Sequence, residues 1–167
     1  MIVIVGHGPS ATSGMLGSVI DSAETVVRMK TALTDPIHRG MKTDYICSRG
    51  TRHCQPGIGF FLLPKKPWIT GENVYPYQKW YDFYRQFGVC AFKPSTGLQS
   101  IFAVMEFLKP TELGLVGFDW LLNPSTAPKG PHDWRSGNAC VRALGIPIID
   151  LSREAAWPNS PPQRAAS

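Results

Sequence analysis

The chain begins with four β-branched residues that lead directly into a pair of glycines. Ile2-Val3-Ile4-Val5 is followed by Gly6-His7-Gly8. An unbroken apolar run of this kind is typical of a strand buried on both faces, as in a parallel sheet. A Gly-x-Gly turn lets the backbone bend tightly, so that amide groups can approach a ligand phosphate. The stretch therefore predicts an α/β domain with a nucleotide site at the end of its first strand.

The rest of the chain alternates between apolar runs and helical periodicity. A short helix through Leu16 and Ile20 is expected after the glycine turn. Further strands are predicted at 25–29, 45–47, 60–63, 113–118 and 146–151, and further helices at 79–87, 95–108 and 135–144. A helix between two strands forms a βαβ unit, which implies parallel strands. We therefore expect one doubly wound, mostly parallel, Rossmann-like α/β domain over residues 1–155. A disordered tail is expected over 156–167, where prolines and small polar residues cannot build a core.

Charge and cysteine content restrict the possible partners. The net charge of +5 suits an anionic ligand such as a nucleotide, and a nucleic acid or a membrane surface is also possible. No leader and no long apolar run is found, so we expect a cytoplasmic protein without a membrane span. The four cysteines form no close pair, which is typical of reduced thiols. Cys47, His53 and Cys54 are followed by no second pair of ligands, so no metal is predicted.

The glycine turn also matches a dinucleotide fingerprint. Gly6-His7-Gly8-Pro9-Ser10-Ala11 fits the loose pattern GxGxxG/A, so binding of NAD or NADP is an alternative. The next strand, however, ends on Arg28-Met29-Lys30 and not on an acidic residue. That ending favours a phosphate over the ribose diol of an adenosine. His7, inside the turn, could contact a phosphate or a base.

Two further segments are candidates for a site. Ser95-Thr96-Gly97 follows Pro94 at the start of a predicted helix, where free amides and the helix dipole can bind an anion. The same residues would serve equally well as a simple helix cap. His132, beside Asp133 in a polar loop, is either a general base or a solvated surface residue.

Taken together, these segments resemble the sialyltransferases of glycosyltransferase family 29. The large sialylmotif of that family is similar to Val3 through Gly8, Ile20-Asp21-Ser22 and Val26 through Lys30. The small sialylmotif is similar to the stretch from Pro94-Ser95-Thr96-Gly97 to Gly117-Phe118, and the very short motif to His132-Asp133. The three matches come in the family's order and cover most of the chain up to about Leu144.

The resemblance implies a metal-independent, inverting transfer of a sugar from a CMP-linked donor. It implies that His132 is the general base, and that the nucleotide is bound by Gly6, His7, Gly8, Ser10, Lys30, Ser95, Thr96 and Gly97. The acceptor would be a glycan or another hydroxyl-bearing molecule, and a nucleic-acid base is also possible. No cofactor other than the nucleotide sugar is implied. The chain would be a compact bacterial or phage version of the family.

Four positions depart from the family pattern. His7 and Lys30 stand where the family usually has asparagines, and Gly137 stands where the very short motif has a glutamate. Leu108 stands where one cysteine of the family's disulfide is expected, which fits a reducing compartment. A non-catalytic nucleotide-binding protein that retains the pocket is therefore the alternative from another functional class.

Overall fold

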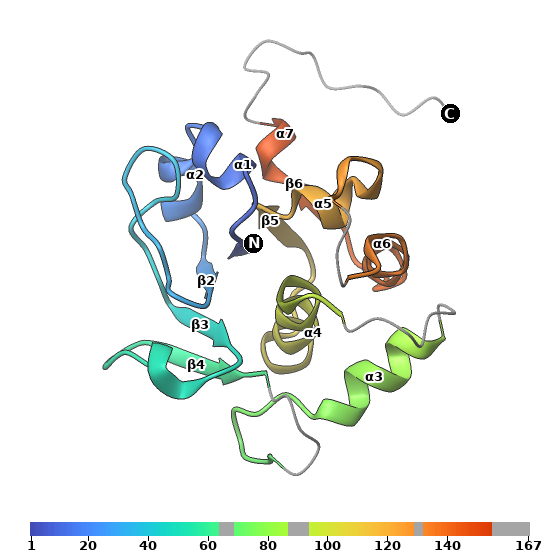
Figure 1. The fold of residues 1–167 in the computed structure, drawn as a ribbon. Helices are drawn as coiled ribbons and strands as arrows, with labels where there is room; N and C mark the ends of the chain where they lie inside the picture. Colours follow the sequence, from blue (N-terminus) through green and yellow to red (C-terminus); the bar gives the residue numbers. More distant parts are fainter. Residues whose placement is uncertain (64–68, 87–93, 129–131, 155–167) are drawn as a thin grey trace.

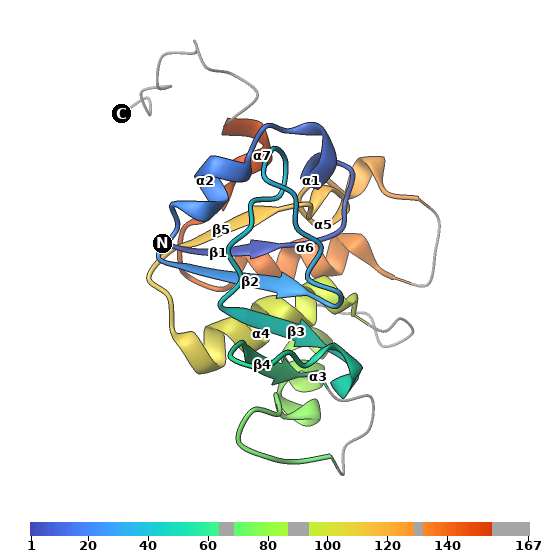
Figure 2. The same ribbon diagram turned by 90° about the vertical axis from the view of Figure 1, so that its left-hand side faces the viewer.

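A single parallel sheet forms the centre of the molecule. The computed structural model describes residues 1–63, 69–86, 94–128 and 132–154. The strands are β1 (Ile2–Val5), β2 (Thr25–Met29), β3 (Tyr45–Ser48), β4 (Gly59–Leu62), β5 (Leu113–Val116) and β6 (Ile148–Asp150). Their order is β4-β3-β2-β1-β5-β6, and every neighbouring pair is parallel. Figure 2 shows the labelled strand arrows pointing one way. The prediction of an open, doubly wound α/β fold is confirmed.

Helices cover both faces of this sheet (Figure 1). One face carries α3 (Tyr77–Arg85), α4 (Thr96–Leu108) and α6 (Trp134–Arg142), and the other carries α1 (Ser10–Ser13), α2 (Gly17–Asp21) and α7 (Leu151–Glu154). The remaining helical segments are α5 (Asp119–Leu122) and the 3₁₀ turns η1 (Thr51–His53) and η2 (Pro124–Thr126). Within the described residues, no helix is both long enough and apolar enough to cross a membrane.

The sheet separates two apolar cores, as its central strands require. Ile4 and Leu115 face the core under α4 and α6, whereas Val3, Val5 and Val116 face the core under α1, α2 and α7. All five side chains are almost fully buried. Because alternate residues of each strand face opposite cores, both faces must be apolar. This is why unbroken apolar runs, and not alternating ones, predict these strands.

Some predicted element boundaries are wrong. The expected strand through Phe118 ends at Val116, because Gly117 has a φ of 72° and turns the chain into α5. The expected strand through Leu151 ends at Asp150, because α7 begins at Leu151. The single helix expected through Leu16 and Ile20 is preceded by a separate helix α1, and Gly14 between them is extended. The predicted tail, 156–167, lies outside the described residues.

The segment between β2 and β3 is held by one buried arginine. Arg28, on β2, is only 1% exposed, and its guanidinium donates hydrogen bonds of 2.7 to 3.2 Å to this segment. The acceptors are the carbonyl oxygens of Leu33, Arg39, Gly40 and Lys42 and the hydroxyl of Thr43. Burial lowers the pKa of this guanidinium. The donors of Arg28 therefore serve the neighbouring backbone and not a ligand.

Candidate functional site

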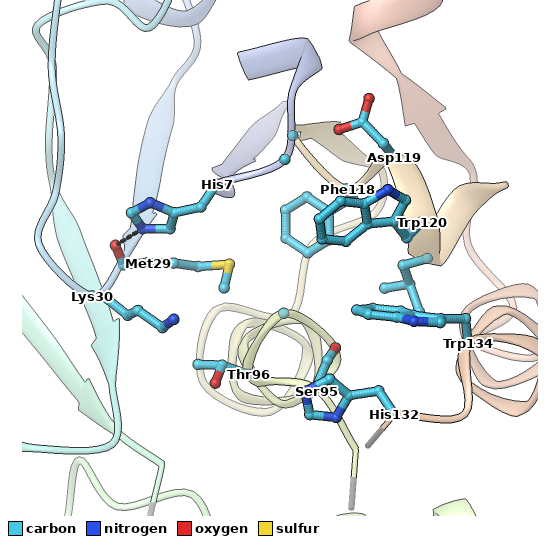
Figure 3. Close-up of a pocket in the computed structure, with 14 residues that line it drawn as sticks. His7, Met29, Lys30, Ser95, Thr96, Phe118, Asp119, Trp120, His132 and Trp134 are labelled. Atoms are coloured by element: carbon cyan, nitrogen blue, oxygen red, sulfur yellow. Dashed lines mark hydrogen bonds between the residues drawn. The ribbon is translucent and has the colours of Figure 1, made fainter. Parts of the chain in front are cut away.

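The strand order places a cavity where ligands of such sheets usually bind. The chain moves from β1 outward to β4 on one side and returns through β5 to β6 on the other, so the order reverses between β1 and β5. Ligands of open α/β sheets bind outside the carboxyl ends of the strands at this point. A cavity of about 240 Å³, here called the main cavity, lies there (Figure 3). Its lining is His7, Gly8, Met29, Lys30, Ser95, Thr96, Gly97, Gly117, Phe118, Asp119, Trp120, Leu121, His132 and Trp134.

Most of the site residues chosen from the sequence meet at this cavity. His7 and Gly8 follow β1, and Lys30 follows β2. Ser95, Thr96 and Gly97 belong to the start of α4, and His132 precedes α6. These segments are distant in the sequence and are brought together by the parallel sheet, whose carboxyl ends share one edge. Gly6 and Ser10 do not line the main cavity.

The glycine turn is packed against the end of β5. The amide of Gly6 donates to the carbonyl of Val116 over 2.7 Å, and the amide of Gly8 donates to the carbonyl of Gly117 over 2.9 Å. A Cβ atom on Gly6 would lie 2.6 Å from the Gly117 carbonyl oxygen. The expectation that these two amides are free to approach a phosphate is therefore wrong. The glycines allow two loops to approach each other.

Replacing Gly8 with alanine is expected to destabilise the fold. The new Cβ would overlap the Asp119 carboxylate and would lie 2.7 Å from the Gly117 carbonyl oxygen, which belongs to the backbone and cannot rotate away. Overpacking of this kind costs about 1–3 kcal/mol. Gly50→Ala is the matched control, because no atom lies within 4 Å of its added Cβ. Urea unfolding of both variants measures the difference, and equal stability would contradict the packing argument.

Ser10 links three segments beside the main cavity. Its hydroxyl donates to Asp119 Oδ2 over 3.0 Å and accepts from the Gly117 amide and the Ser152 hydroxyl. Its amide lies 3.3 Å from both carboxylate oxygens of Asp119. The turn after β1 is thereby connected to the turn after β5 and to α7. Ser10 does not line the main cavity, and its hydroxyl is bonded to Asp119 and Gly117, which do. Its binding of a nucleotide stays a prediction.

Two basic residues border the cavity near the end of β2. His7 is exposed, and its Nε2 lies 2.9 Å from the carbonyl oxygen of Met29. A carbonyl can only accept, so Nε2 carries a proton and Nδ1 is the accepting nitrogen of the neutral ring. Lys30 is also exposed and has a φ of 53°, with its amide donating to the Cys47 carbonyl over 2.8 Å. Figure 3 shows its ammonium group on the side of Thr96.

The start of α4 combines a side-chain cap with amides that find no partner within the helix itself. The Ser95 hydroxyl accepts from the Leu98 amide over 3.1 Å, so the predicted N-cap is confirmed. The amides of Thr96 and Gly97 belong to the first turn, where the helix offers them no carbonyl partner. A helix of this length places partial positive charge at its N-terminus. Capping and anion binding are therefore compatible at this position, because they use different groups.

His132 enters the cavity from the loop before α6. Its ring meets Trp134 edge to face with centroids 5.3 Å apart, and Trp134 meets Trp120 at 5.7 Å. Asp133 accepts from the amides of Arg135 and Ser136 over 3.1 Å each and therefore caps α6. His132 and Ser95 both line the main cavity (Figure 3).

Several lining residues were not predicted from the sequence. Phe118 was predicted as the end of a strand, and Asp119 and Trp120 were given no role, although all three follow β5 at the reversal of strand order. Their place directly after a predicted strand was the sequence signal that could have identified them as site residues. Gly137, where the resembling family has a glutamate, is buried in α6, and an added Cβ would lie 2.8 Å from Leu121 Cδ1. A longer side chain at this position would require the Leu121 side chain to move.

The described residues hold no group of three or more histidine, cysteine, aspartate or glutamate side chains able to bind a metal. Cys47, Cys54 and Cys140 are free thiols, and Cys90 lies outside the described residues. Burial raises the pKa of Cys47 and of Cys140 to about 12. Neither thiol is ionised near neutral pH, so neither serves as a nucleophile.

No model of a known protein family matches the chain, and no curated protein sequence matches it either. Solved structures do match. A mammalian sialyltransferase in complex with Gal-beta-1-3GalNAc-ortho-nitrophenol aligns with a TM-score of 0.62 at 20% identity, over 89% of this chain and 68% of that one. The sialyltransferase CstII from Campylobacter jejuni, in complex with the substrate analogue CMP-3FNeuAc, aligns with a TM-score of 0.55 at 12% identity, over 93% of this chain and 81% of that one. At these identities the likeness establishes a shared fold.

Proposed function

We propose that the chain is a glycosyltransferase that takes its sugar from a CMP-linked donor. The observation that carries this proposal is the composition of the main cavity. His7, Lys30, the start of α4 and His132 meet at the reversal of strand order. The fold is shared with two sialyltransferases, one of which holds a CMP-sugar analogue and the other a glycan. The sequence motifs that resemble the sialylmotifs supply most of the residues of this cavity.

The donor phosphate is assigned to the start of α4. The amides of Thr96 and Gly97 and the positive end of the helix are suited to an anion, and Lys30 lies at the same place. These groups would stabilise the charge that develops on the phosphate as CMP leaves. A monophosphate leaving group needs less neutralisation than a diphosphate. The proposed reaction therefore uses no metal.

His132 is assigned as the general base. It would take the proton of an acceptor hydroxyl while the hydroxyl oxygen forms a bond to the anomeric carbon of the donor sugar. The bond from that carbon to the phosphate oxygen breaks, and CMP carries the electron pair away. Attack opposite to the leaving group inverts the configuration at the anomeric carbon. Trp134, in edge contact with His132, restricts the orientation of the imidazole.

A non-catalytic nucleotide-binding protein is the second candidate. It is favoured by Gly137, which is packed against Leu121 where the resembling family has a glutamate. A dinucleotide enzyme is less well supported. The amides of Gly6 and Gly8 are already bonded to the carbonyls of Val116 and Gly117, and Lys30 follows β2 where an acidic residue would bind a ribose diol.

A nucleotide panel tests the donor assignment. Thermal unfolding is measured with CMP, CDP, UMP, UDP, GDP, NAD and NADP at equal concentrations. A ligand that binds the folded state raises its apparent stability by mass action, by about 2.7 kcal/mol at a hundred times Kd. We expect CMP to raise the melting temperature, and UMP, GDP, NAD and NADP to have smaller effects. A positive result justifies assaying CMP-sugars with candidate glycan acceptors.

The other outcomes have defined meanings. Preferential stabilisation by UDP or GDP would retain a transferase but change its donor. Stabilisation by NAD or NADP alone would overturn the proposal in favour of a dinucleotide enzyme. No stabilisation by any nucleotide would contradict the assignment of the main cavity as a nucleotide site.

A further inference from the structure

A second cavity lies beside the main one, and it is lined by basic residues. Here called the basic cavity, it has a volume of about 370 Å³ and is formed at the ends of β2 and β3, by η1 and by the start of α4. Its lining is Lys30, Ser48, Arg49, Gly50, Arg52, His53 and Thr96. Lys30 and Thr96 line both cavities, so a ligand at the start of α4 reaches both.

The charge of the basic cavity is uncompensated. Lys30, Arg49 and Arg52 bring three cations, and no carboxylate is among the described lining residues. Within the described part of the chain, none of these cations forms an ion pair. The positive end of α4 adds to the same field through Thr96. An anionic ligand is the natural partner for such a concentration of positive charge.

Of the three cations, Arg49 has the position best suited to binding an anion. It is half-buried, and burial lowers the pKa of its guanidinium, with no neighbouring carboxylate to oppose the effect. One guanidinium nitrogen, Nη2, donates to the Pro94 carbonyl over 3.1 Å, which fixes the side chain against the residue preceding the cap of α4. A guanidinium has five donors, and its planar fork matches a phosphate or carboxylate. Partial burial without a counter-charge is costly, and a bound anion would remove that cost.

Arg52 and His53 form the outer wall of the basic cavity. Arg52 Nε donates to His53 Nε2 over 3.1 Å, so this imidazole nitrogen accepts and the ring is neutral in this arrangement. Arg52 is exposed and retains its remaining donors for a ligand. Its removal is therefore not expected to disturb the core.

We propose that the basic cavity binds a second anionic group, a phosphate or a carboxylate, in addition to the phosphate held at the start of α4. The group belongs to the substrate pair of the proposed transferase, and only this attribution rests on the proposed function. Two sources have the same chemistry. The group is either a further phosphate on the nucleotide, which would make the donor nucleotide a diphosphate and not CMP, or an acidic substituent on the acceptor.

Inorganic phosphate is the probe for this second site. Its binding is measured by calorimetry at constant ionic strength, with the protein saturated with CMP and also without CMP. We expect phosphate to bind the CMP-saturated protein, and Arg49→Gln and Arg52→Gln each to weaken this binding by about tenfold or more, as the loss of a charge-assisted hydrogen bond predicts. The affinity for CMP should stay within about twofold, because CMP is assigned to the main cavity.

Arg142→Gln is the matched control. It makes the same change of charge on an exposed residue of α6 whose guanidinium contacts Asn138, and it lines neither cavity. It should leave phosphate binding unchanged. A general effect of net charge would appear equally in all three variants and would contradict a local site. Arg52→Gln, at an exposed position, keeps the test valid even where Arg49→Gln lowers the stability of the fold.

Two results would overturn the proposal. One is strict competition between phosphate and CMP, which would mean one anion site and not two. The other is phosphate binding that neither Arg49→Gln nor Arg52→Gln changes. If CMP does not bind at all, the proposed function fails, but phosphate titration of the free protein and its variants still tests the basic cavity.

A series of nucleotides distinguishes the two sources of the anionic group. If CDP binds more tightly than CMP, and Arg49→Gln removes only the difference, the second group is a phosphate of the nucleotide. If CDP gains nothing and phosphate binds together with CMP, the group belongs to the acceptor. Acidic glycans, carrying a carboxylate or a phosphate, are then the acceptors to assay.

Discussion

His132→Ala is expected to reduce turnover with a CMP-sugar by about 10²–10⁴-fold, the usual effect of losing a general base. The affinity for CMP should change by about twofold or less, because the nucleotide phosphate is assigned to the start of α4 and to Lys30. Turnover is measured as release of CMP at saturating donor, and affinity by calorimetry. This split between kcat and binding distinguishes a base from a residue that only shapes the pocket.

A second variant and a rescue experiment distinguish the loss of a general base from other causes of lost turnover. His132→Gln keeps a polar side chain of similar length but cannot act as a base near neutral pH, so it should lose as much turnover as the alanine variant. Added imidazole should restore part of the turnover of His132→Ala, because the space left by the side chain admits a small base. Unchanged turnover in both variants would place the base elsewhere. Absence of turnover in the unaltered protein, together with tight CMP binding, would favour the non-catalytic candidate.

Arg28→Met is expected to lower the free energy of unfolding by at least about 3 kcal/mol. Methionine fills a similar volume but leaves the carbonyl oxygens of Leu33, Arg39, Gly40 and Lys42 without their donor. Each buried polar group that loses its partner costs about 1–3 kcal/mol. Arg28 is 1% exposed, so water cannot replace the guanidinium without opening the segment between β2 and β3. Urea unfolding followed by circular dichroism measures the loss.

Arg142→Met is the control for this second prediction. It removes an exposed arginine and should change stability by about 0.5 kcal/mol or less. Arg28→Lys should recover only part of the loss, because an ammonium has three donors and cannot reach acceptors arranged around a planar fork. A loss no larger than that of the control would show that the arginine is not what holds this segment.

The strands could be predicted because their physical cause is local. Each central strand is buried on both faces, so an apolar run marks it, and α4 is long enough for one-face periodicity with Ser95 at its cap. The short helices α1, α5 and α7 have four residues each, which is too few for periodicity to identify them. Their formation depends on tertiary contacts, such as the bonds between Ser10 and Asp119.

The lining of the main cavity was predictable where it follows strand ends and a helix start. His7, Lys30 and Thr96 were found in this way. Trp120 and Trp134 were missed because they contact each other between α5 and α6, and nothing in the sequence indicates that these two helices are neighbours. The structural role of Arg28 was not predicted, for a related reason. Whether an arginine serves a ligand or the backbone depends on where the neighbouring segment folds, and composition does not specify that.

The central position of β1 has a consequence for synthesis of the chain. Ile2 pairs with Thr25 on one side and with Leu113 on the other, so β1 receives its second neighbour only after β5 has left the ribosome. Until then, one edge of β1 exposes unpaired backbone groups together with apolar side chains, a state prone to association. Contacts so distant in sequence also slow folding. Nascent chains that stop before β5 should therefore be recognised by chaperones and proteases as unfinished.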